Sequence, residues 1–434
     1  MNQLQRILDE LINNEKTGHA GFRNYSPATM RALMRRLGRP ERGFKSVHIA
    51  GTNGKGSTAY MISRILMTAG YRTGLYVSPH LQKVTERISI NGRPVSAKRL
   101  AAILRAVLEQ SRIGRLSPTW FDALTAAAFI YFDQESVDIA VVETGLGGRL
   151  DSTNVIRPLV SVITTISLDH TPLLGRTLRE ISAEKAGIIK NRVPVVTGNT
   201  SAGVLTPIES ASREKGSSLY VMGRDFSIGA FLPAAPGTLT YTFGARRIEK
   251  LRLCPKGVFQ RTNAALAITA TLLLARRGFA IAPDDIRVAL GRLVIPGRLE
   301  IISEKPLIIF DPAHNPEALR TVVNHITAEY PGRKPVFLVC FMKDKNIKEL
   351  FEALSAADPA AIVYYLPDDA RAFLPDSSRP QVQNVPFHII SGKDADSRLR
   401  TIIERLGGDA RVIVATGSFR IYPAVKKLAL KFLR

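Results

Sequence analysis

The stretch SVHIAGTNGKGSTAYMISRILMTAG, from Ser46 to Gly70, decides the fold class of this chain. A run rich in β-branched residues leads into closely spaced glycines, and a helix-length amphipathic segment follows. A strand, a glycine-rich turn and a helix in this order bring backbone N–H groups and the positive end of the helix to one point, which favours an anion. The usual phosphate-loop pattern G-x-x-x-x-G-K-[ST] is not met, because Gly56 follows Lys55 and the hydroxyl group arrives one place late, at Ser57.

The turn still supplies the groups that a nucleoside triphosphate needs. Lys55 can reach the β- and γ-phosphates, and Ser57 or Thr58 at the start of the helix can meet a Mg²⁺ ion. The alternative is an ordinary glycine-rich turn, but the density of glycines beside a lysine favours the nucleotide site. We predict that ATP binds to Thr52, Asn53, Gly54, Lys55, Gly56, Ser57 and Thr58.

Length and composition indicate a soluble protein of two domains. The chain has 434 residues, of which 45% are hydrophobic, and this length usually exceeds what one hydrophobic core serves. It contains no uncharged apolar run of about 18 residues and no signal-peptide core. Cys254 and Cys340 have no metal-ligand spacing and fit a reducing compartment. We therefore expect a cytoplasmic protein that does not bind membranes.

The formal charge of +23 raises the question of a nucleic-acid partner. The basic residues are scattered in short groups, such as 31–42, 244–253 and 426–434, without interleaved aromatic residues that could stack on bases. A solvated surface, or a field that attracts an anionic substrate, explains this pattern better. We expect no nucleic-acid partner.

The order of elements predicts an α/β protein. Between residues 46 and 197, short runs rich in Val, Ile and Thr alternate with helix-length segments, which is typical of a doubly wound, mostly parallel sheet. Residues 218–254 read as a small antiparallel addition, and a helix is expected over 262–277. The alternation restarts after "LVIPGRLEII" as a smaller Rossmann-like domain, with strands expected in PLIIFDPAHN, PVFLVCFM, AAIVYYLP and DARVIVATGS. We predict domains 1–296 and 297–434.

Polar residues follow several predicted strands of the first domain, where ligands of open α/β sheets bind. Ser78 and His80 follow "GLYV", Glu143 ends "VDIAVV", and Asp169 and His170 follow "VSVITTIS". A carboxylate directly after a buried strand is the expected Mg²⁺ holder of an NTPase, although Glu143 alone could serve as a helix cap and His170 alone as a hydrogen-bonded loop residue. We expect these groups to converge.

The chain resembles the folylpolyglutamate synthase and dihydrofolate synthase family of the Mur ligase superfamily over nearly its whole length. The resemblance is carried by motifs in the family's order: AGTNGKGST (50–58), YVSPHLQKVTERI (76–88), ETGLGGRLDSTN (143–154), SLDHTPLLG (167–175), EKAGIIK (184–190), PGRLE (296–300), DPAHNP (311–316) and TGSF (416–419). The loop G-x-x-G-K-G-[ST] is that superfamily's own form of the phosphate loop.

The resemblance implies an ATP-dependent ligase that joins L-glutamate to a pteroate or folate carboxylate through an acyl phosphate. It implies catalytic roles for Lys55, His170, Lys185 and His314, and two Mg²⁺ sites, with K⁺ as a further cation. The implied metal-binding residues are Ser57, Ser78, Glu143, His170 and Lys185. Lys185 is carried as a carbamate in the family, because an ammonium group cannot ligate a metal; read without the family, it is an ordinary helix lysine.

The resemblance also implies further contacts to the nucleotide and to the pterin substrate. Asn263, Arg298, Asp311, His314 and Ser418 are expected on the nucleotide. The expected substrate contacts are Thr29, Met30, His80, Phe121, Asp122, Leu150, Asp151 and Ser152. This sequence departs from the family in the segment from Asn24, where Ser26 and Pro27 cap a helix start, and at Asp122, where glutamate is common.

Several functional alternatives remain open at this point. A peptidoglycan ligase would bring a UDP-binding domain before the loop, for which this sequence has too short a segment. A nucleic-acid-stimulated ATPase would explain the charge but leaves the later motifs without a role, and a binding protein without catalysis would not need the metal-binding residues. Within the family, we expect both ligase activities in one monomeric enzyme, with a single-function folylpolyglutamate synthase as the alternative. The small-molecule substrates would be dihydropteroate, reduced folates, L-glutamate and ATP.

Overall fold

The computed structural model of the protein describes residues 3–11, 27–229, 237–376, 382, 385–392, 395–405 and 411–432. The chain divides into two compact units, of which unit 1 comprises Met1–Cys254 and Gln260–Leu293, and unit 2 comprises Pro255–Phe259 and Val294–Arg434. The short segment Pro255–Phe259 thus belongs to unit 2 although unit 1 resumes after it. The chain passes from unit 1 to unit 2 for the second time between Leu293 and Val294. The predicted domain boundary at 296/297 lies close to this point and stays a prediction.

Unit 1 is built on an eight-stranded sheet in the order β4-β3-β2-β5-β1-β6-β7-β8. Its strands are β1 (Lys45–Ala50), β2 (Thr73–Tyr76), β3 (Ile88–Ile90), β4 (Arg93–Pro94), β5 (Ile139–Glu143), β6 (Val160–Ile163), β7 (Val195–Thr197) and β8 (Leu219–Val221). The strands from β2 to β8 in this order pair in parallel, and β3 and β4 add an antiparallel edge. The strands that follow β1 in the sequence lie on both sides of it, with β2 and β5 on one side and β6 to β8 on the other. The carboxyl end of β1 is therefore a topological switch point, the place where open α/β sheets bind ligands.

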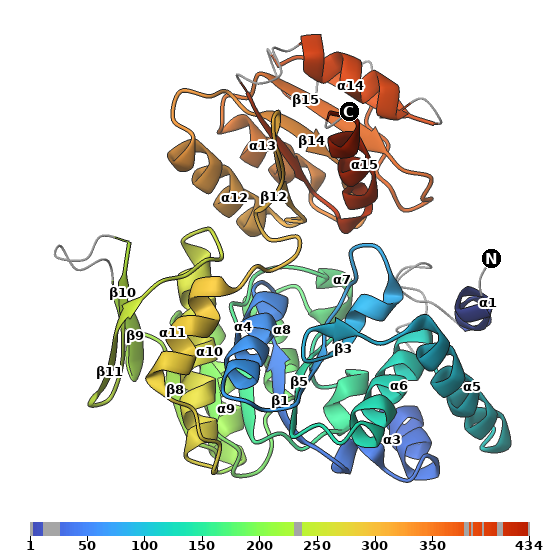
Figure 1. The fold of residues 1–434 in the computed structure, drawn as a ribbon, viewed down its shortest axis with the longest axis vertical. Coiled ribbons are helices and arrows are strands. Elements are labelled where there is room, and N and C mark those ends of the chain that lie inside the picture. Colours follow the sequence, from blue (N-terminus) through green and yellow to red (C-terminus); the bar gives the residue numbers. More distant parts are fainter. Residues whose placement is uncertain are drawn as a thin grey trace. The chain divides into compact units, whose positions relative to one another are not determined.

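Helices cover the faces of this sheet (Figure 1). They are α1 (Gln3–Asp9), α3 (Pro27–Arg36), α4 (Lys55–Thr68), α5 (Ala97–Ile113), α6 (Trp120–Gln134), α7 (Thr171–Leu174), α8 (Leu178–Ala186), α9 (Ala202–Glu214), α10 (Phe259–Ala275) and α11 (Pro283–Arg292). The helix predicted over 262–277 is α10, which begins three residues and ends two residues earlier. It is apolar on nearly every side and correspondingly buried.

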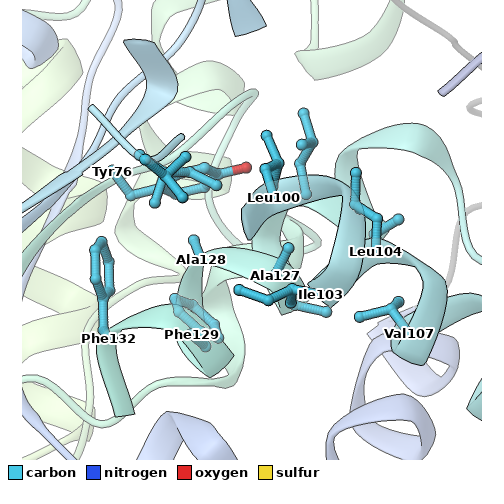
Figure 2. Close-up of a cluster of buried hydrophobic side chains, with 14 of the residues drawn as sticks. Tyr76, Leu100, Ile103, Leu104, Val107, Ala127, Ala128, Phe129 and Phe132 are labelled. Atoms are coloured by element: carbon cyan, nitrogen blue, oxygen red, sulfur yellow. The ribbon is translucent and has the colours of Figure 1, made fainter. Parts of the chain in front are cut away.

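One hydrophobic core of unit 1 lies between α5, α6 and the sheet. Figure 2 shows side chains of α5 beside Ala127, Ala128 and Phe129 of α6, with Tyr76 of β2 next to them. The small residues of α6 let the helices approach closely, because alanines leave room for the larger side chains of α5. The hydroxyl groups of Tyr76 and Thr125 share a hydrogen bond of 3.1 Å, so the one polar tip in this view is satisfied.

The antiparallel addition is a separate three-stranded sheet of β9 (Phe226–Gly229), β10 (Leu239–Phe243) and β11 (Arg246–Leu251), in the order β11-β10-β9. It lies beside α11 in Figure 1. The expectation of hairpins over the whole of 218–254 was wrong at its start, because β8 instead extends the main sheet in parallel with β7. With only three residues, β8 is too short for its hydrophobic periodicity to distinguish a strand of the parallel sheet from a strand of an antiparallel hairpin.

Unit 2 contains a six-stranded sheet in the order β12-β13-β17-β14-β15-β16. The strands are β12 (Glu300–Glu304), β13 (Leu307–Asp311), β14 (Val336–Val339), β15 (Ala361–Leu366), β16 (Phe387–Ser391) and β17 (Val412–Thr416), and the helices are α12 (Pro316–Glu329), α13 (Ile347–Ser355), α14 (Ala395–Arg405) and α15 (Tyr422–Phe432). All neighbours pair in parallel except β12 and β13. The Rossmann-like expectation is confirmed, with β16 as a strand that the sequence pattern missed. In the described part of the chain, no helix has both the length and the apolar character needed to cross a bilayer.

Candidate active site

The glycine-rich loop connects β1 to α4. Gly51 (φ 152°) and Gly54 (φ 86°) take positive φ values, which glycine adopts with little strain. Gly54 is the N-cap of α4, which begins at Lys55, and the N–H of Thr58 donates to the Gly54 carbonyl at 2.9 Å. The earlier N–H groups of the helix have no partner within it. The turn therefore has the geometry of an anion site.

Helix α10 packs directly on this turn. A Cβ atom on Gly54 would lie 2.3 Å from Oδ1 of Asn263, so the close approach itself requires glycine. Nδ2 of Asn263 donates to Oε1 of Gln260 at 2.9 Å, and Nε2 of Gln260 lies 3.4 Å from the Ser57 hydroxyl. The sequence analysis missed Gln260; the available signal was its place three residues before Asn263, which puts both side chains on one face of the helix.

The loop is also held by the segment that follows β6. The N–H of Thr52 donates to the Thr165 carbonyl at 2.8 Å, and the Thr164 hydroxyl donates to the Asn53 carbonyl at 2.7 Å. The side chains of Thr52 and Asn53 donate to Ser167, at 3.1 Å and 3.2 Å. These bonds fix the loop before any ligand arrives, which lowers the entropy cost of binding one.

Two lysines meet at the loop carbonyls. Nζ of Lys55 donates to the Thr52 carbonyl at 3.2 Å, and Nζ of Lys185 donates to the Gly51 carbonyl at 2.8 Å. Lys185 is 3% exposed. Burial, and then the neighbouring charge of Lys55, lower the pKa of Lys185 to about 7. A lysine whose pKa is lowered this far loses its charge much more readily than an exposed lysine, a shift that is typical of functional sites.

The end of α8 positions Lys185 through a tight contact with the loop after β5. A Cβ atom on Gly148 would lie 2.9 Å from the carbonyls of Glu184 and Lys185, and one on Gly187 would lie 2.4 Å from Cβ of Arg149. Arg149 also donates to Glu184 through Nε at 3.0 Å and Nη2 at 2.8 Å. The glycines of "GLGGR" and "KAG" thus allow two backbones to touch beside the phosphate loop.

Ser78 and Glu143 come together at the ends of the neighbouring strands β2 and β5. The N–H of Ser78 donates to Oε2 of Glu143 at 3.0 Å, and Glu143 is 3% exposed. The buried hydroxyl of Thr58 has no hydrogen-bond partner among the described residues. Carboxylate and hydroxyl oxygens are hard donors of the kind that fit Mg²⁺. No group of three or more His, Cys, Asp or Glu side chains suited to a metal occurs within the described ranges.

His170 lies in the loop after β6 and takes a left-handed backbone conformation (φ 49°) at the N-cap of α7. Its N–H donates to Oδ1 of Asp169 at 2.9 Å, and its Nε2 lies 3.9 Å from Oδ2 of the same residue. The negative charge of Asp169 partly opposes the lowering of the Lys185 pKa that burial and Lys55 cause. The metal-binding role of His170 stays a prediction.

The predicted substrate residues at the start of α6 are held within the protein. The N–H of Thr119 donates to Oδ2 of Asp122 at 2.9 Å and the N–H of Asp122 donates to the Thr119 hydroxyl at 3.1 Å, which forms a capping box. The Ser152 hydroxyl donates to Oδ1 of Asp122 at 2.8 Å. Asp122 is 1% exposed, so both of its oxygens serve the fold. Phe121 stays half-buried and covers Gly145, where a Cβ atom would lie 2.5 Å from its ring.

Asp151 organises the loop between β5 and the following 3₁₀ turn, η4 (Ser152–Val155). The N–H groups of Leu146 and Thr153 donate to it at 2.9 Å and 3.0 Å, and the Thr153 hydroxyl also donates to it. Burial raises the pKa of Asp151, and these hydrogen bonds oppose that rise. Leu150, next to it, is half-buried.

The loop after β2 contains a residue that the sequence analysis missed. Nε of Arg87 donates to Nδ1 of His80 at 2.9 Å, and its guanidinium group lies 4.7 Å from the centroid of the Trp120 ring. Arg87 is 1% exposed. Because Nε of arginine can only donate, Nδ1 of His80 accepts, and neutral His80 carries its proton on Nε2.

Helix α3 carries the remaining predicted substrate residues. Met30 is fully buried and packs in the core shared with α5 and α6; its contact with substrate stays a prediction. Thr29, one position earlier, is half-buried. Asn24 and Ser26 lie outside the described residues.

The predicted nucleotide residues of unit 2 gather where β13 and β17 end, with Asp311 opposite Thr416. Asp311 accepts the N–H groups of Leu299 and Ala313 at 3.1 Å and 3.0 Å. Burial raises the pKa of Asp311, and the nearby charge of Arg298 opposes that rise.

A single aromatic ring connects the other members of this group. The guanidinium of Arg298 lies 5.4 Å from the centroid of the Phe419 ring, and the imidazole of His314 lies 6.5 Å from it. Nδ1 of His314 is 2.9 Å from the Pro312 carbonyl. The Ser418 hydroxyl accepts the N–H of Arg420 at 3.2 Å as the N-cap of a short turn. Segments far apart in the sequence therefore meet at one sheet edge.

Comparison with known proteins first defines the class. Residues 49–201 match the Mur ligase middle domain and residues 297–419 match the glutamate ligase domain of Mur ligases. These matches, with the two α/β units and the glycine-rich loop between β1 and α4, define a Mur ligase.

Full-length relatives then define the family. A dihydrofolate synthase/folylpolyglutamate synthase of Bacillus subtilis is 34% identical over 92% of this chain and 93% of its own length. A folylpolyglutamate synthase of Lacticaseibacillus casei is 35% identical over the same shares. A structure of Mycobacterium tuberculosis folylpolyglutamate synthase complexed with ADP and AMPPCP matches with a TM-score of 0.86 and 30% identity, covering 100% of this chain and 98% of that one. The chain belongs to the folylpolyglutamate synthase and dihydrofolate synthase family, and it is an ATP-dependent ligase.

Proposed function

We propose that this enzyme adds L-glutamate both to dihydropteroate and to reduced folates that already carry glutamate. The observation that carries the ligase chemistry is that Lys55 and Lys185 both donate to carbonyls of the loop after β1, while Ser78 and Glu143 pair at the ends of the strands β2 and β5 of the same sheet. The double activity is supported by the Bacillus subtilis relative, a dihydrofolate synthase/folylpolyglutamate synthase that matches this chain over 93% of its own length.

The reaction has two steps that move negative charge. The acceptor carboxylate attacks the γ-phosphorus of ATP, which forms an acyl phosphate and releases ADP. The amine of glutamate then attacks the acyl carbon, and a tetrahedral intermediate collapses to the amide with loss of phosphate and a proton. In this scheme Lys55 and the N–H groups at the start of α4 hold the β- and γ-phosphates and offset the charge that develops on them.

We assign Mg²⁺ binding to Ser57, Ser78 and Glu143, whose hydroxyl and carboxylate oxygens suit this ion. When bound, Mg²⁺ supplies positive charge beside the phosphates. Glu143, His170 and Lys185 are assigned to a second ion, with Lys185 as its carbamate. A neutral amine is needed to react with CO₂, and the lowered pKa of Lys185, about 7, supports this assignment because the neutral fraction grows as the pH rises through that value.

The acceptor would lie over Phe121 and the loop 145–152. Phe121 offers an aromatic face for the pterin, and the hydrogen bonds of Asp122 and Asp151 hold the loop beside it. We assign His80, Thr29, Leu150 and Ser152 to the same substrate. Within unit 1, Asn263 beside the phosphate loop is assigned to nucleotide binding. Within unit 2, the cluster of Arg298, Asp311, His314 and Ser418 is assigned to nucleotide binding.

A product assay tests this function. Wild-type protein is incubated with ATP, Mg²⁺ and labelled glutamate, and with either dihydropteroate or tetrahydrofolate as the acceptor. Label in the product from both acceptors supports the double activity. Product from tetrahydrofolate alone would show a single-function folylpolyglutamate synthase, which is the activity for which the Lacticaseibacillus casei relative is named.

A second arm addresses the charge of +23. ATP turnover is measured with and without added RNA or single-stranded DNA, in the absence of folate. We expect no stimulation, because the proposed reaction needs an acceptor carboxylate. Stimulation comparable to that by folate would favour the nucleic-acid-dependent ATPase, and size-exclusion chromatography of the same sample tests the expected monomer.

A further inference from the structure

His48 is an unusual residue for the centre of a parallel sheet. It lies in β1, two residues before the strand ends, and is fully buried. Its Nε2 is 2.8 Å from the Thr153 hydroxyl, whereas its Nδ1 has no hydrogen-bond partner in the described part of the chain. An unsatisfied buried polar atom costs roughly 1–3 kcal/mol. An aliphatic residue would avoid that cost, so the contact with Thr153 is what distinguishes this side chain from its apolar neighbours on the strand.

The direction of the hydrogen bonds follows from the donors around Asp151. Its two oxygens accept N–H groups of Leu146 and Thr153, which favours the ionised carboxylate as an acceptor. The Thr153 hydroxyl also donates to Asp151 and has only one proton to give. It must therefore accept from His48, so Nε2 of His48 carries the ring proton. Nδ1 is then a bare acceptor, in agreement with its lack of a partner.

These contacts form a relay from the interior of the sheet to the loop 145–152. His48 donates to Thr153, Thr153 donates to Asp151, and Asp151 receives the N–H of Leu146. The other side of the loop is tied to α6, because Ser152 donates to Asp122. The loop is thus fixed from β1 on one side and from α6 on the other.

We propose that His48 is a positioning residue for the acceptor substrate, acting through Thr153 and Asp151 on the loop 145–152. This inference rests on the proposed function, because it takes that loop as the place where the acceptor binds. His48 itself touches no reacting atom. The phosphate loop and the start of α4 are held by other bonds, to the segment 164–167 and from Gln260 of α10 to Ser57, so we expect ATP binding not to depend on the relay.

A matched pair at Thr153 tests the relay. Thr153→Val keeps the shape of the side chain but removes the hydroxyl as both donor and acceptor, whereas Thr153→Ser keeps the hydroxyl. We expect Thr153→Val to raise the KM for dihydropteroate about tenfold, because the relay loses a hydrogen bond and a net hydrogen-bond free energy corresponds to roughly that factor. The KM for ATP should change less than about twofold. Thr153→Ser should stay within about twofold of wild type in both constants.

A second pair separates positioning from stability. His48→Gln keeps an amide donor near the position of Nε2, and His48→Leu removes it. We expect His48→Leu, but not His48→Gln, to reproduce the rise in acceptor KM. If the relay acts as one unit, His48→Leu combined with Thr153→Val raises the KM little more than either change alone. Melting temperatures measured on every variant show which of them remain folded.

The outcomes distinguish this inference from the function on which it rests. An unchanged acceptor KM in Thr153→Val, an equal rise in the KM for ATP, or failure of Thr153→Ser to behave like wild type overturns the relay. If His48→Leu does not fold, the Thr153 pair and His48→Gln still decide the question. Wild-type protein that ligates glutamate to neither acceptor overturns the proposed function, and this inference falls with it.

Discussion

The two units place functional groups at the same kind of location, the carboxyl ends of parallel strands, but build the sites differently. In unit 1 one continuous stretch supplies the phosphate loop, with glycines at positive φ and Lys55 at the first position of α4. In unit 2 the cluster is assembled from Arg298, the turn 311–314 and the segment 416–419, which meet only because β13 and β17 are neighbours.

This difference separates backbone recognition from side-chain recognition. A turn that offers N–H groups to a phosphate is defined by local conformation, so a short motif encodes it. A cluster of side chains from three segments depends on the order of the strands, which no single segment contains. Predictions that disturb the two sites separately can test this contrast, beginning with the largest expected effect.

Removing charge at the phosphate site should abolish turnover. Lys55→Ala or Glu143→Ala is expected to lower kcat by about 10³-fold or more, because each removes a charged group beside the reacting phosphate. Ligation is measured with saturating acceptor, with the exposed residue change Lys98→Ala as control. Near-normal ligation by either variant, with the control unaffected, would show that the phosphate site is wrongly assigned.

Lys185 should be equally essential if it carries a carbamate. We expect Lys185→Ala to be inactive and to regain part of its activity with a short carboxylic acid, which can replace the carbamate oxygens. The measurement is ligation as a function of added acetate or formate, with Glu143→Ala as the variant that should not respond. Full activity in Lys185→Arg would contradict the carbamate, because a guanidinium group cannot be carboxylated in this way.

Substitution of a glycine in the loop after β1 of unit 1, Gly54, and of one in the loop after β17 of unit 2, Gly417, should impair different properties of the protein. A Cβ atom at Gly54 would meet the Asn263 side chain, whereas one at Gly417 would lie 2.6 Å from the Cys340 carbonyl, and both residues have positive φ. We expect Gly54→Ala to raise the KM for ATP at least about tenfold and Gly417→Ala chiefly to lower the melting temperature, because a backbone carbonyl cannot move aside.

Gly203→Ala is the matched control for this pair, since nothing lies within 4 Å of its added Cβ atom. It should leave both the KM for ATP and the melting temperature nearly unchanged. If Gly54→Ala only destabilises the protein, the contrast between the two sites is lost.

The acceptor site should respond without the nucleotide site. Phe121→Ala is expected to raise the KM for dihydropteroate and for tetrahydrofolate about tenfold, as loss of a stacking face does, with the KM for ATP unchanged. Thr29→Ala should affect dihydropteroate more than tetrahydrofolate. Steady-state kinetics with each acceptor check this, and a rise confined to the KM for ATP would place Phe121 elsewhere.

The smallest effect concerns acid stability. Burial keeps the pKa of His48 well below its usual 6.5, so below pH 6.5 the unfolded chain takes up a proton that the folded chain does not. Stability from this residue is therefore lost as the pH falls, by at most about 1.4 kcal/mol per pH unit. His48→Gln should narrow the drop in melting temperature between pH 7 and pH 5. An identical drop in both proteins would contradict the lowered pKa.

The sequence alone determined the class of fold, the phosphate loop and the family. Alternation of β-branched runs with helix-length segments predicted the parallel sheets, because the period of an element is a local property. The motifs from Ala50 to Phe419 carried the resemblance that the comparisons confirmed. Where an element was short or weakly patterned, as for β8 and β16, local periodicity was insufficient.

Only the tertiary structure decided how side chains are used. It placed Met30 in the core and engaged both oxygens of Asp122 in a capping box and a bond to Ser152. It brought Gln260 to the phosphate loop, Arg87 to His80, and His48 to Thr153 across 105 residues of chain. The physical reason is that burial and hydrogen bonding depend on the neighbours of a residue in space, and strand order sets those neighbours.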